Sequence, residues 1–171
     1  LCELHPEEAQ VLGSHFSTDP RMAVHARDGY AAIKAQLPPK HGAQKIARGL
    51  VLIDPPYEAQ LDEFDTALSA LREGLARWPQ GMFALWYPIK QRRNLYAFYR
   101  KAAGLAAKSS LLLELLVRPD DSPLRMNGSG MLLLNAPWQF DGLMRPALQA
   151  MQQALGETGA STRVEWLKIP A

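Results

Sequence analysis

Short apolar runs alternate with amphipathic segments along most of the chain. Residues 50–53 and 82–86 are almost entirely apolar, which is typical of strands covered on both faces. Between these two runs, apolar side chains recur every three or four positions across residues 62–77, which predicts an amphipathic helix. The pattern therefore predicts strands that alternate with helices.

The same pattern extends toward both ends of the chain. Further strands are predicted to end near Glu3, at residues 22–25, and within residues 109–119, 129–138 and 161–170. Further helices are predicted at residues 6–16, 30–36, 91–103 and 140–156. Residues 37–48 contain prolines and a glycine among polar side chains, which predicts a loop.

Strands that alternate with helices imply parallel crossover connections, so we expect an α/β fold. We expect a mostly parallel sheet with an antiparallel pair of strands near the C-terminus, in a single domain over residues 1–171. Ligands of open α/β sheets bind beyond the carboxyl ends of the strands, so the side chains that follow strands are candidate site residues. These are Glu3, Asp28, Gly29, and the residues at 54–57, 87–88 and 135–138.

Composition excludes several classes of protein. With 171 residues and 47% apolar content, the chain can bury a core. Cys2 is the only cysteine, which excludes a disulfide framework and suits a reducing cytosol. No apolar run reaches the roughly 20 residues of a membrane helix, so we expect a soluble intracellular protein. The histidines are scattered, so we expect no metal, and the net charge of +2 allows a nucleic-acid partner without requiring one.

The clearest chemical signal follows the apolar run at residues 50–53, where Asp54, Pro55, Pro56 and Tyr57 stand. The exocyclic amino group of adenine is a poor nucleophile because its lone pair is delocalised into the ring. Two acceptors, the Asp54 carboxylate and the Pro55 carbonyl, can draw this nitrogen toward tetrahedral geometry. The prolines restrict the backbone, and Tyr57 can stack on a base taken out of its helix. The pattern therefore favours methyl transfer to the amino group of a base.

The same four residues also have a structural interpretation. Two prolines can end a strand, and an aspartate there can cap the next helix. However, an acid or amide, two prolines and an aromatic residue arise by chance in a chain of this length at below about one per cent. We therefore favour the functional interpretation.

Residues 54–57 resemble motif IV of the S-adenosylmethionine-dependent amino-methyltransferases that act on nucleic acids. A wider set of motifs, in order along essentially the whole chain, resembles the RlmJ family of 23S ribosomal RNA (adenine-N6)-methyltransferases. These motifs are ELHP at residues 3–6, RDGY at 27–30, LVLIDPPYE at 50–58, ALWYP at 84–88 and SGMLLLNAPW at 129–138.

The resemblance implies a Rossmann-like methyltransferase sheet that uses S-adenosyl-L-methionine to methylate the N6 amino group of an adenine in 23S ribosomal RNA. It also implies a cytoplasmic monomer that acts on the RNA before the ribosome is fully assembled. Two alternatives remain open. One is an adenine-N6 methyltransferase that acts on DNA, and the other is a non-catalytic RNA-binding remnant.

The resemblance also assigns roles to individual residues. Glu3 would accept hydrogen bonds from the cofactor ribose, although it also fits an acid at the start of a helix. Asp28 and Gly29 would contact the cofactor adenine, although Asp-Gly is also a common turn. Asp54 would accept a hydrogen bond from the amino group and would also lie beside the methyl donor. Pro55, Pro56 and Tyr57 would complete the catalytic turn.

Two further segments are candidate substrate contacts. A basic and aromatic helix at residues 90–101 would hold RNA phosphates or present an ordinary solvated face. Its candidate RNA-binding cations are Lys90, Arg92, Arg93, Arg100 and Lys101. Residues 135–138, NAPW, repeat the pattern of residues 54–57 at another strand end, and we interpret them as a wall of the substrate pocket.

One family feature is missing from this sequence. Methyltransferases of this fold carry a glycine-rich loop after their first strand, and this chain has none ahead of residues 3–6. Residues 127–130, NGSG, precede a predicted strand instead of following one. We therefore expect an N-terminally truncated chain that lacks the first strand and this loop. On that hypothesis the 171 residues alone bind the cofactor weakly and have little activity.

Overall fold

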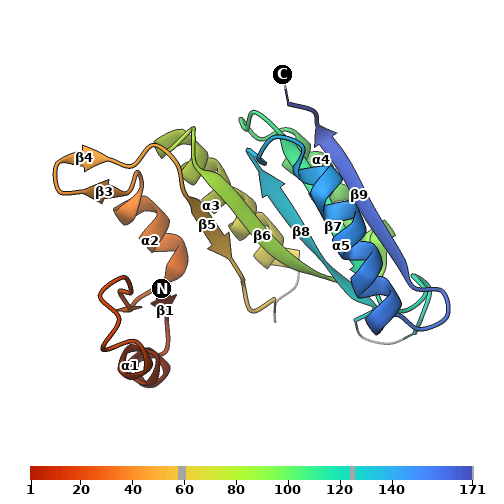
Figure 1. Ribbon diagram of the computed structural model, residues 1–171, viewed down its shortest axis with the longest axis horizontal. Coiled ribbons are helices and arrows are strands. Elements are labelled where there is room, and N and C mark those ends of the chain that lie inside the picture. Colours follow the sequence, from red (N-terminus) through yellow and green to blue (C-terminus); the bar gives the residue numbers. More distant parts are fainter. Residues whose placement is uncertain (58–60, 124–125, 171) are drawn as a thin grey trace. The chain divides into compact units, whose positions relative to one another are not determined.

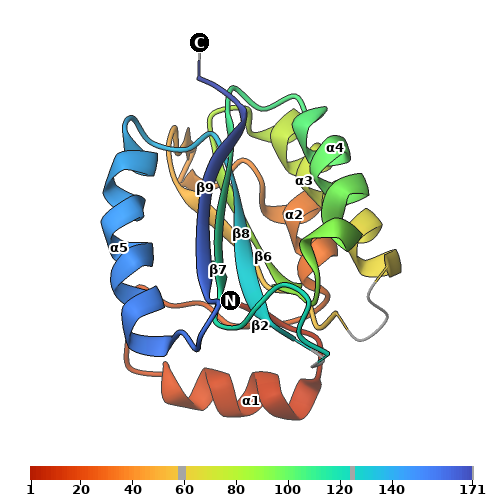
Figure 2. The same ribbon diagram turned by 90° about the vertical axis from the view of Figure 1, so that its right-hand side faces the viewer.

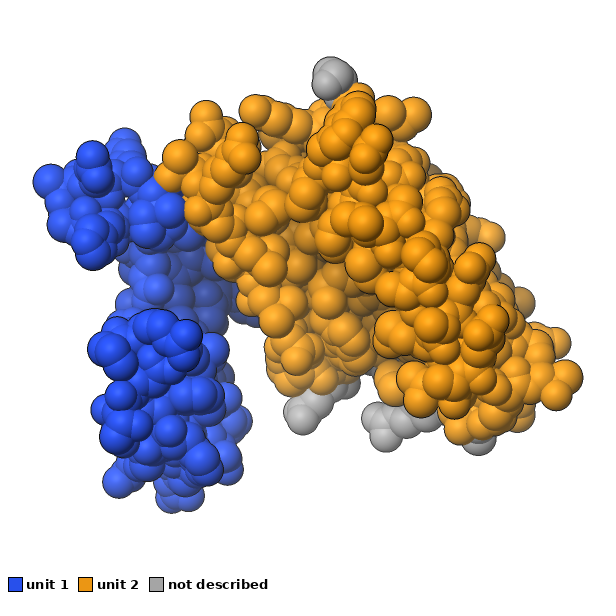
Figure 3. All heavy atoms as spheres, viewed as in Figure 1, with its two compact units in different colours: residues 1–46 blue, residues 47–171 orange. Residues whose placement is uncertain are grey.

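The computed structural model describes residues 1–57, 61–123 and 126–170, and the side chains of all of these except residues 61 and 62. The chain folds into two compact units, Leu1–Ile46 and Ala47–Ala171 (Figure 3). Each unit has its own strands and helices, in the order labelled in Figure 1. The expectation of a single methyltransferase domain stays a prediction.

Unit 1 contains a short parallel strand pair, two helices and a hairpin. Its elements are β1 (Cys2–Glu3), α1 (Pro6–His15), β2 (His25–Ala26), α2 (Gly29–Gln36), β3 (Lys40–His41) and β4 (Gln44–Lys45). β1 and β2 are parallel, so the residues that follow both strands lie at the same edge of this pair. The strand expected at residues 22–25 begins only at His25, and residues 37–48, expected as a loop, contain the β3–β4 hairpin.

Local signals explain where the two helices of unit 1 begin. Pro6 occupies the first turn of α1, where its missing N–H is not needed, and Glu7 and Glu8 interact favourably with the positive end of the helix dipole. α2 begins after Asp28, whose side chain accepts a hydrogen bond from the backbone N–H of Tyr30 at 2.9 Å. Both helices therefore start where the sequence predicts.

Unit 2 is built on a five-stranded sheet with the strand order β5-β6-β8-β7-β9. Its elements are β5 (Leu50–Ile53), α3 (Leu61–Arg77), β6 (Met82–Ile89), a 3-10 helix (Arg92–Leu95), α4 (Tyr96–Ala103), β7 (Ser110–Leu116), β8 (Gly128–Leu134), α5 (Phe140–Leu155) and β9 (Ser161–Lys168). The helix expected at residues 91–103 is divided into the 3-10 turn and α4. The other elements lie close to their predicted positions.

Strand direction differs from the expectation. β5 and β6 are parallel, whereas β6 and β8, β8 and β7, and β7 and β9 are antiparallel. The expected antiparallel pair near the C-terminus is confirmed, but the expectation of a mostly parallel sheet is wrong for these five strands. A parallel pairing of β7 with β8 would need a long crossover, usually a helix, and the described residues between them form none. The Rossmann-like order and the missing first strand stay predictions.

Helices cover both faces of this sheet, with α5 on one face and α3 and α4 on the other (Figure 2). Side chains alternate along β7. Leu113 and Leu115 pack with Leu148 of α5 in one buried cluster, whereas Glu114 points to the opposite face and bonds to Tyr99 of α4. No described helix is long and apolar enough to cross a membrane.

The edge strand β5 is less covered than its composition predicts. Leu50 and Leu52 are 58% and 62% exposed, although the apolar run suggested cover on both faces. Leu52 pairs with Ala84, which joins the α5 cluster, but α5 packs mainly over β7 and β9. The prediction of a strand buried on both faces is therefore wrong at these two leucines.

Candidate active site

Residues 54–57 leave the sheet at the end of β5. Ile53 pairs with Leu85 in parallel, so this segment lies beside the second half of β6. Asp54 is exposed, and its carboxylate has no hydrogen bond or ion pair with the described residues. Pro55 is buried, whereas Pro56 is exposed. An exposed carboxylate that is unpaired among the described residues therefore lies just beyond a strand end, where ligands of such sheets bind.

Tyr57 is fixed by its surroundings. Its φ of 51° is unusual for a bulky residue and costs on the order of 1–3 kcal/mol. Its hydroxyl donates a hydrogen bond to the carbonyl oxygen of Trp86 at 2.7 Å, and its ring centroid lies 5.0 Å from that of Phe64. Burial raises the pKa of the Tyr57 phenol well above its usual value, with further contributions from Glu63 and Asp54. The strained conformation is thus held by specific contacts, as is common at functional sites.

The packing of Tyr57 bears on its expected role. The residue is only 5% exposed, so its ring offers little surface on which a base could stack in this arrangement. The hydroxyl instead ties the turn that carries Asp54 to the backbone of β6. Stacking of a base on Tyr57 stays a prediction, and it would require the ring to leave its present packing.

A row of paired residues across three strands supports the end of β6. Tyr87 on β6, Gly130 on β8 and Glu114 on β7 are direct neighbours in the sheet. A Cβ at Gly130 would lie 2.3 Å from the Tyr87 ring, so only glycine leaves room for this ring. The Tyr87 hydroxyl crosses β8 and donates to Glu114 Oε1 at 2.9 Å. The NGSG segment therefore enters β8 and has a packing role.

Glu114 is the centre of a buried polar cluster. Its carboxylate is fully buried, accepts a hydrogen bond from the Tyr99 hydroxyl at 2.5 Å, and pairs with Arg92 Nε at 2.8 Å. The guanidinium of Arg163 lies 3.7 Å from the same carboxylate. Burial, together with the neighbouring Glu114, raises the pKa of Tyr87 and of Tyr99, so both phenols stay protonated and donate. These partners compensate for burying the charge.

The cluster changes the interpretation of the basic segment at residues 90–101. The side chain of Arg92 is only 20% exposed, and its guanidinium is committed to Glu114. Arg92 is therefore removed from the candidate RNA contacts, because breaking a buried ion pair is costly. Lys101 is exposed but pairs with Asp65 at 2.5 Å. RNA contact by the other cations stays a prediction for Lys90, Arg93, Arg100 and Lys101.

Among the expected cofactor contacts, Glu3 is the last residue of β1, and Asp28 and Gly29 come shortly after its parallel partner β2. Glu3 Oε1 accepts a hydrogen bond from the backbone N–H of His5 at 2.8 Å, and Asp28 Oδ1 caps α2. The second carboxylate oxygen of each acid has no hydrogen bond among the described residues. A Cβ at Gly29 would lie 3.9 Å from that of Cys2, an ordinary contact. The structural roles are thus present, and the cofactor roles stay predictions.

Residues 135–138 lie elsewhere. β8 is antiparallel to β6, so the chain that leaves β8 runs past the start of β6, whereas residues 54–57 lie beside its second half. Trp138 is 81% exposed. The interpretation of this segment as a wall of the substrate pocket is therefore wrong, because the direction of β8 carries it to the opposite edge of the sheet.

The side chain of Asn135 is fully used in structure. Its amide nitrogen donates to the carbonyl oxygens of Gly81 at 2.7 Å and Pro79 at 3.1 Å, and its oxygen accepts from the backbone N–H of Lys108 at 2.8 Å. Its φ of 56° is one that asparagine tolerates well. Asn135 therefore joins three loops and has little capacity left for a ligand.

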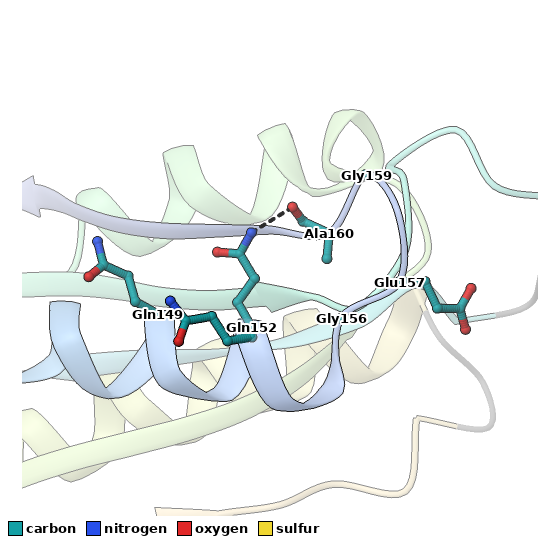
Figure 4. A pocket seen from close by; sticks show the side chains of 7 residues that line it. Gln149, Gln152, Gly156, Glu157, Gly159 and Ala160 are labelled. Atoms are coloured by element: carbon teal, nitrogen blue, oxygen red, sulfur yellow. Dashed lines mark hydrogen bonds between the residues drawn. The ribbon is translucent and has the colours of Figure 1, made fainter.

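A hollow lies between the end of α5 and the start of β9 (Figure 4). Gln152 Nε2 donates to the Ala160 carbonyl oxygen there at 2.8 Å. The charged side chain in the lining, Glu157, pairs with Arg118 at 2.9 Å. The lining residues are Gln149, Gln152, Gln153, Gly156, Glu157, Gly159 and Ala160, and none is a candidate site residue. Among the residues the structure describes, no group of His, Cys, Asp or Glu could hold a metal ion.

Sequence reasoning missed Glu114 and Gly130. A lone acid inside the apolar strand SLLLELL signals a buried and paired charge, because a carboxylate is rarely buried without partners. The glycine could have been suspected from its position inside an apolar run. The bond from Tyr57 to the Trp86 carbonyl has no sequence signal, since every residue carries such an oxygen.

The fold and the site define a mixed α/β protein with a central sheet and an Asp-Pro-Pro-Tyr turn after one of its strands. The model of the family described as "Ribosomal RNA large subunit methyltransferase D, RlmJ" matches residues 1–168. The chain therefore belongs to this family.

Curated relatives and a solved structure agree with this assignment. Proteins named "Ribosomal RNA large subunit methyltransferase J" from Haemophilus influenzae and Escherichia coli are 37% and 35% identical over 98% of this chain. The chain spans 58% of the length of each. A crystal structure of protein LPL1258 from Legionella pneumophila aligns with a TM-score of 0.79 and 27% identity, over 96% of this chain and 59% of that one.

Proposed function

We propose that this chain carries the methyl-transfer site of an enzyme that methylates the N6 amino group of an adenine in 23S ribosomal RNA, with S-adenosyl-L-methionine as methyl donor. We further propose that it acts in the cytoplasm, as a monomer, before the ribosome is fully assembled. Family membership supports the proposal. The observation that carries it is Asp54, which is exposed and has no hydrogen bond or ion pair with the described residues, directly after β5 on a turn that Tyr57 ties to β6.

The proposed chemistry needs two acceptors at one turn. The Asp54 carboxylate accepts a hydrogen bond from one N–H of the adenine amino group, and the Pro55 carbonyl accepts one from the other N–H. Together they draw the nitrogen toward tetrahedral geometry and return its lone pair for attack. S-adenosyl-L-methionine, when bound, supplies an electrophilic methyl group. Acceptors that are held in place before the reaction lower the barrier because they need no rearrangement.

Tyr57 has a positioning role in this proposal. Its hydrogen bond to Trp86 and its contact with Phe64 hold a strained turn in one conformation. Asp54, which stands three positions earlier, is thereby kept at the end of β5. A misplaced acceptor costs rate even when it is still present, so the Tyr57 hydroxyl contributes to catalysis without touching the substrate.

The residues of unit 1 fit part of the cofactor. Glu3 and Asp28 each keep one carboxylate oxygen without a hydrogen bond among the described residues. Carboxylates suit the ribose hydroxyls and the amino group of an adenosine. We therefore propose that Glu3 binds the ribose, and that Asp28 and Gly29 lie against the adenine.

A product analysis tests the proposed function. The protein encoded by the complete reading frame that contains this sequence is incubated with labelled S-adenosyl-L-methionine and protein-free large-subunit RNA. The RNA is digested to nucleosides and analysed by mass spectrometry. We expect N6-methyladenosine among the digested nucleosides.

Parallel reactions separate the alternatives. Duplex DNA and intact large subunits replace the free RNA under the same conditions. Methyl transfer to DNA without transfer to RNA would show that the substrate is DNA and not the proposed RNA. Failure of the complete protein to methylate any of these substrates would favour a non-catalytic RNA-binding protein.

A further inference from the structure

Charge is divided unevenly within unit 1. Residues 1–28 contain five acids and two arginines, whereas residues 29–46 contain three lysines and no acid. Two of these lysines, Lys40 and Lys45, lie in the β3–β4 hairpin. The second half of the unit is therefore positive, although the unit as a whole is balanced.

The hairpin holds its two lysines side by side. β3 and β4 are antiparallel, with Lys40 paired to Lys45 and His41 paired to Gln44. The loop between them has two residues, and Gly42 at its first position has a φ of 60°, which suits a tight type II′ turn. Directly paired residues carry their side chains on the same face, with Cβ atoms about 4.5–5.5 Å apart. The turn thus sets a fixed pair of cations.

This arrangement is unfavourable for the hairpin by itself. Like charges directly opposite each other destabilise a strand pair, and an isolated two-stranded hairpin is at best marginally stable. All residues from Lys40 to Lys45 are exposed, so burial does not compensate. Neither lysine forms an ion pair with any residue that the structure describes. A polyanion is the partner that turns this repulsion into attraction.

The cations of residues 90–101 differ in this respect. Arg92 is buried against Glu114, and Lys101 is paired with Asp65. That segment has more cations than the hairpin, but part of its charge is neutralised within the protein. The charge of Lys40 and Lys45, in contrast, is not neutralised by any ion pair with the described residues.

We propose that Lys40 and Lys45 form a contact surface for the phosphate backbone of the RNA substrate. The proposal rests on the function proposed above, since it takes RNA as the partner. The hairpin has no aromatic or large apolar side chain between its two lysines, so it lacks the apolar anchor of a membrane-binding element. A rigid pair of cations without base-reading groups contributes affinity and little sequence preference.

The salt dependence of RNA binding tests this surface. The complete protein is titrated into a fluorescently labelled hairpin of large-subunit RNA at several salt concentrations. Each neutralised phosphate contributes about 0.7 to 0.9 to the slope of log affinity against log salt. The double variant Lys40→Gln/Lys45→Gln is therefore expected to reduce the steepness of this slope by about 1.4 to 1.8.

Two further double variants serve as controls. Arg21→Gln/Arg77→Gln removes the same charge from arginines that are paired with Asp19 and Glu73, and it is expected to leave the slope nearly unchanged. Lys40→Arg/Lys45→Arg keeps the charge and is expected to keep the slope. The glutamine variant also relieves repulsion, so its melting temperature is expected not to fall.

The outcomes separate this surface from the proposed function. An unchanged slope in a folded Lys40→Gln/Lys45→Gln protein that still methylates RNA would overturn the surface and leave the function standing. If the glutamine variant lowers the slope but the unsubstituted protein methylates no substrate, the surface would be supported and the methyl transfer refuted. Equal loss of slope in the arginine control would also overturn the surface, because net charge alone would then explain it.

Discussion

Two strand ends in unit 2 share a sequence pattern, namely a side chain with a carboxyl or amide group at the first position, a proline at the third and an aromatic residue at the fourth. Residues 54–57, DPPY, follow β5, and residues 135–138, NAPW, follow β8. In both, one residue adopts a positive φ, which is 51° at Tyr57 and 56° at Asn135. The segments look alike in sequence, but the positive φ falls at the last position of residues 54–57 and at the first position of residues 135–138.

Their polar groups are used in opposite ways. Asn135 makes three hydrogen bonds to backbone groups of Pro79, Gly81 and Lys108, whereas Asp54 has no hydrogen bond with the described residues. The aromatic residues differ as well in their exposure, because Tyr57 is buried at 5% exposed and Trp138 is 81% exposed. Residues 54–57 thus carry a polar group that is unbonded among the described residues, whereas the polar group of residues 135–138 holds loops together.

The difference shows that a motif is informative only with its hydrogen-bond partners. A polar side chain whose bonds are satisfied by the protein stabilises the fold, and removing it leaves backbone groups unpaired. An exposed polar side chain on a rigid turn contributes little to stability and is available to a ligand. The comparison predicts that substitutions in the two segments affect different measurements.

The largest effect is expected for Asp54→Ala. Loss of one of two preorganised acceptors should lower the rate of RNA methylation at least about a hundredfold. The free energy of unfolding should change by less than about 0.5 kcal/mol, because Asp54 is exposed and has no hydrogen bond or ion pair with the described residues. Single-turnover methylation and urea unfolding measure the two quantities. A rate near that of the unsubstituted protein would remove Asp54 from the chemistry.

The next effect is expected for Asn135→Ala, and it concerns stability. Three backbone groups lose their partner, and a side chain suited to positive φ is lost, so the free energy of unfolding should fall by about 2–3 kcal/mol. The methylation rate per folded molecule should not change. Asn135→Asp keeps the acceptor and loses the donors, so its free energy of unfolding should lie between those of the unsubstituted protein and Asn135→Ala. A stable but inactive Asn135→Ala protein would return residues 135–138 to the active site.

A smaller effect is expected for Tyr57→Phe. The substitution removes the bond to the Trp86 carbonyl and keeps the ring, so it should cost about 1 kcal/mol of stability. The methylation rate should fall about tenfold, with RNA affinity unchanged, because the turn is less well held.

A matched control and the competing role complete this test. Tyr96→Phe removes a hydroxyl from a residue that is 65% exposed, and neither quantity should change. If Tyr57 instead stacks on the base, Tyr57→Phe keeps the full rate and Tyr57→Leu loses it. That pattern would refute the positioning role.

The smallest effect is expected for Trp138→Ala. Although this tryptophan corresponds to Tyr57 in the shared pattern, it is 81% exposed. Stability should change by less than about 0.5 kcal/mol, and the methylation rate should stay the same. Loss of rate would mean that Trp138 contacts the substrate, which the direction of β8 argues against.

Local signals in the sequence predict where most helices and strands begin and end. Pro6 and the acids after it predict the start of α1, and Asp28 predicts the cap of α2, because these signals act within a few residues. The spacing of apolar side chains predicts α3, and the apolar runs predict β5 and β6. Residues 54–57 stand out on residue type alone, and the motifs along the chain indicate the family that the comparisons confirm.

Strand direction and the partners of polar groups, by contrast, depend on contacts between distant parts of the chain. β8 pairs antiparallel with β6 and β7, which moves Asn135 away from residues 54–57. Glu114 draws Arg92 into a buried cluster, although Arg92 looks like an RNA-binding cation in the sequence. These outcomes depend on hydrogen bonds and burial between residues far apart in the chain, and local sequence patterns carry no record of such distant pairings.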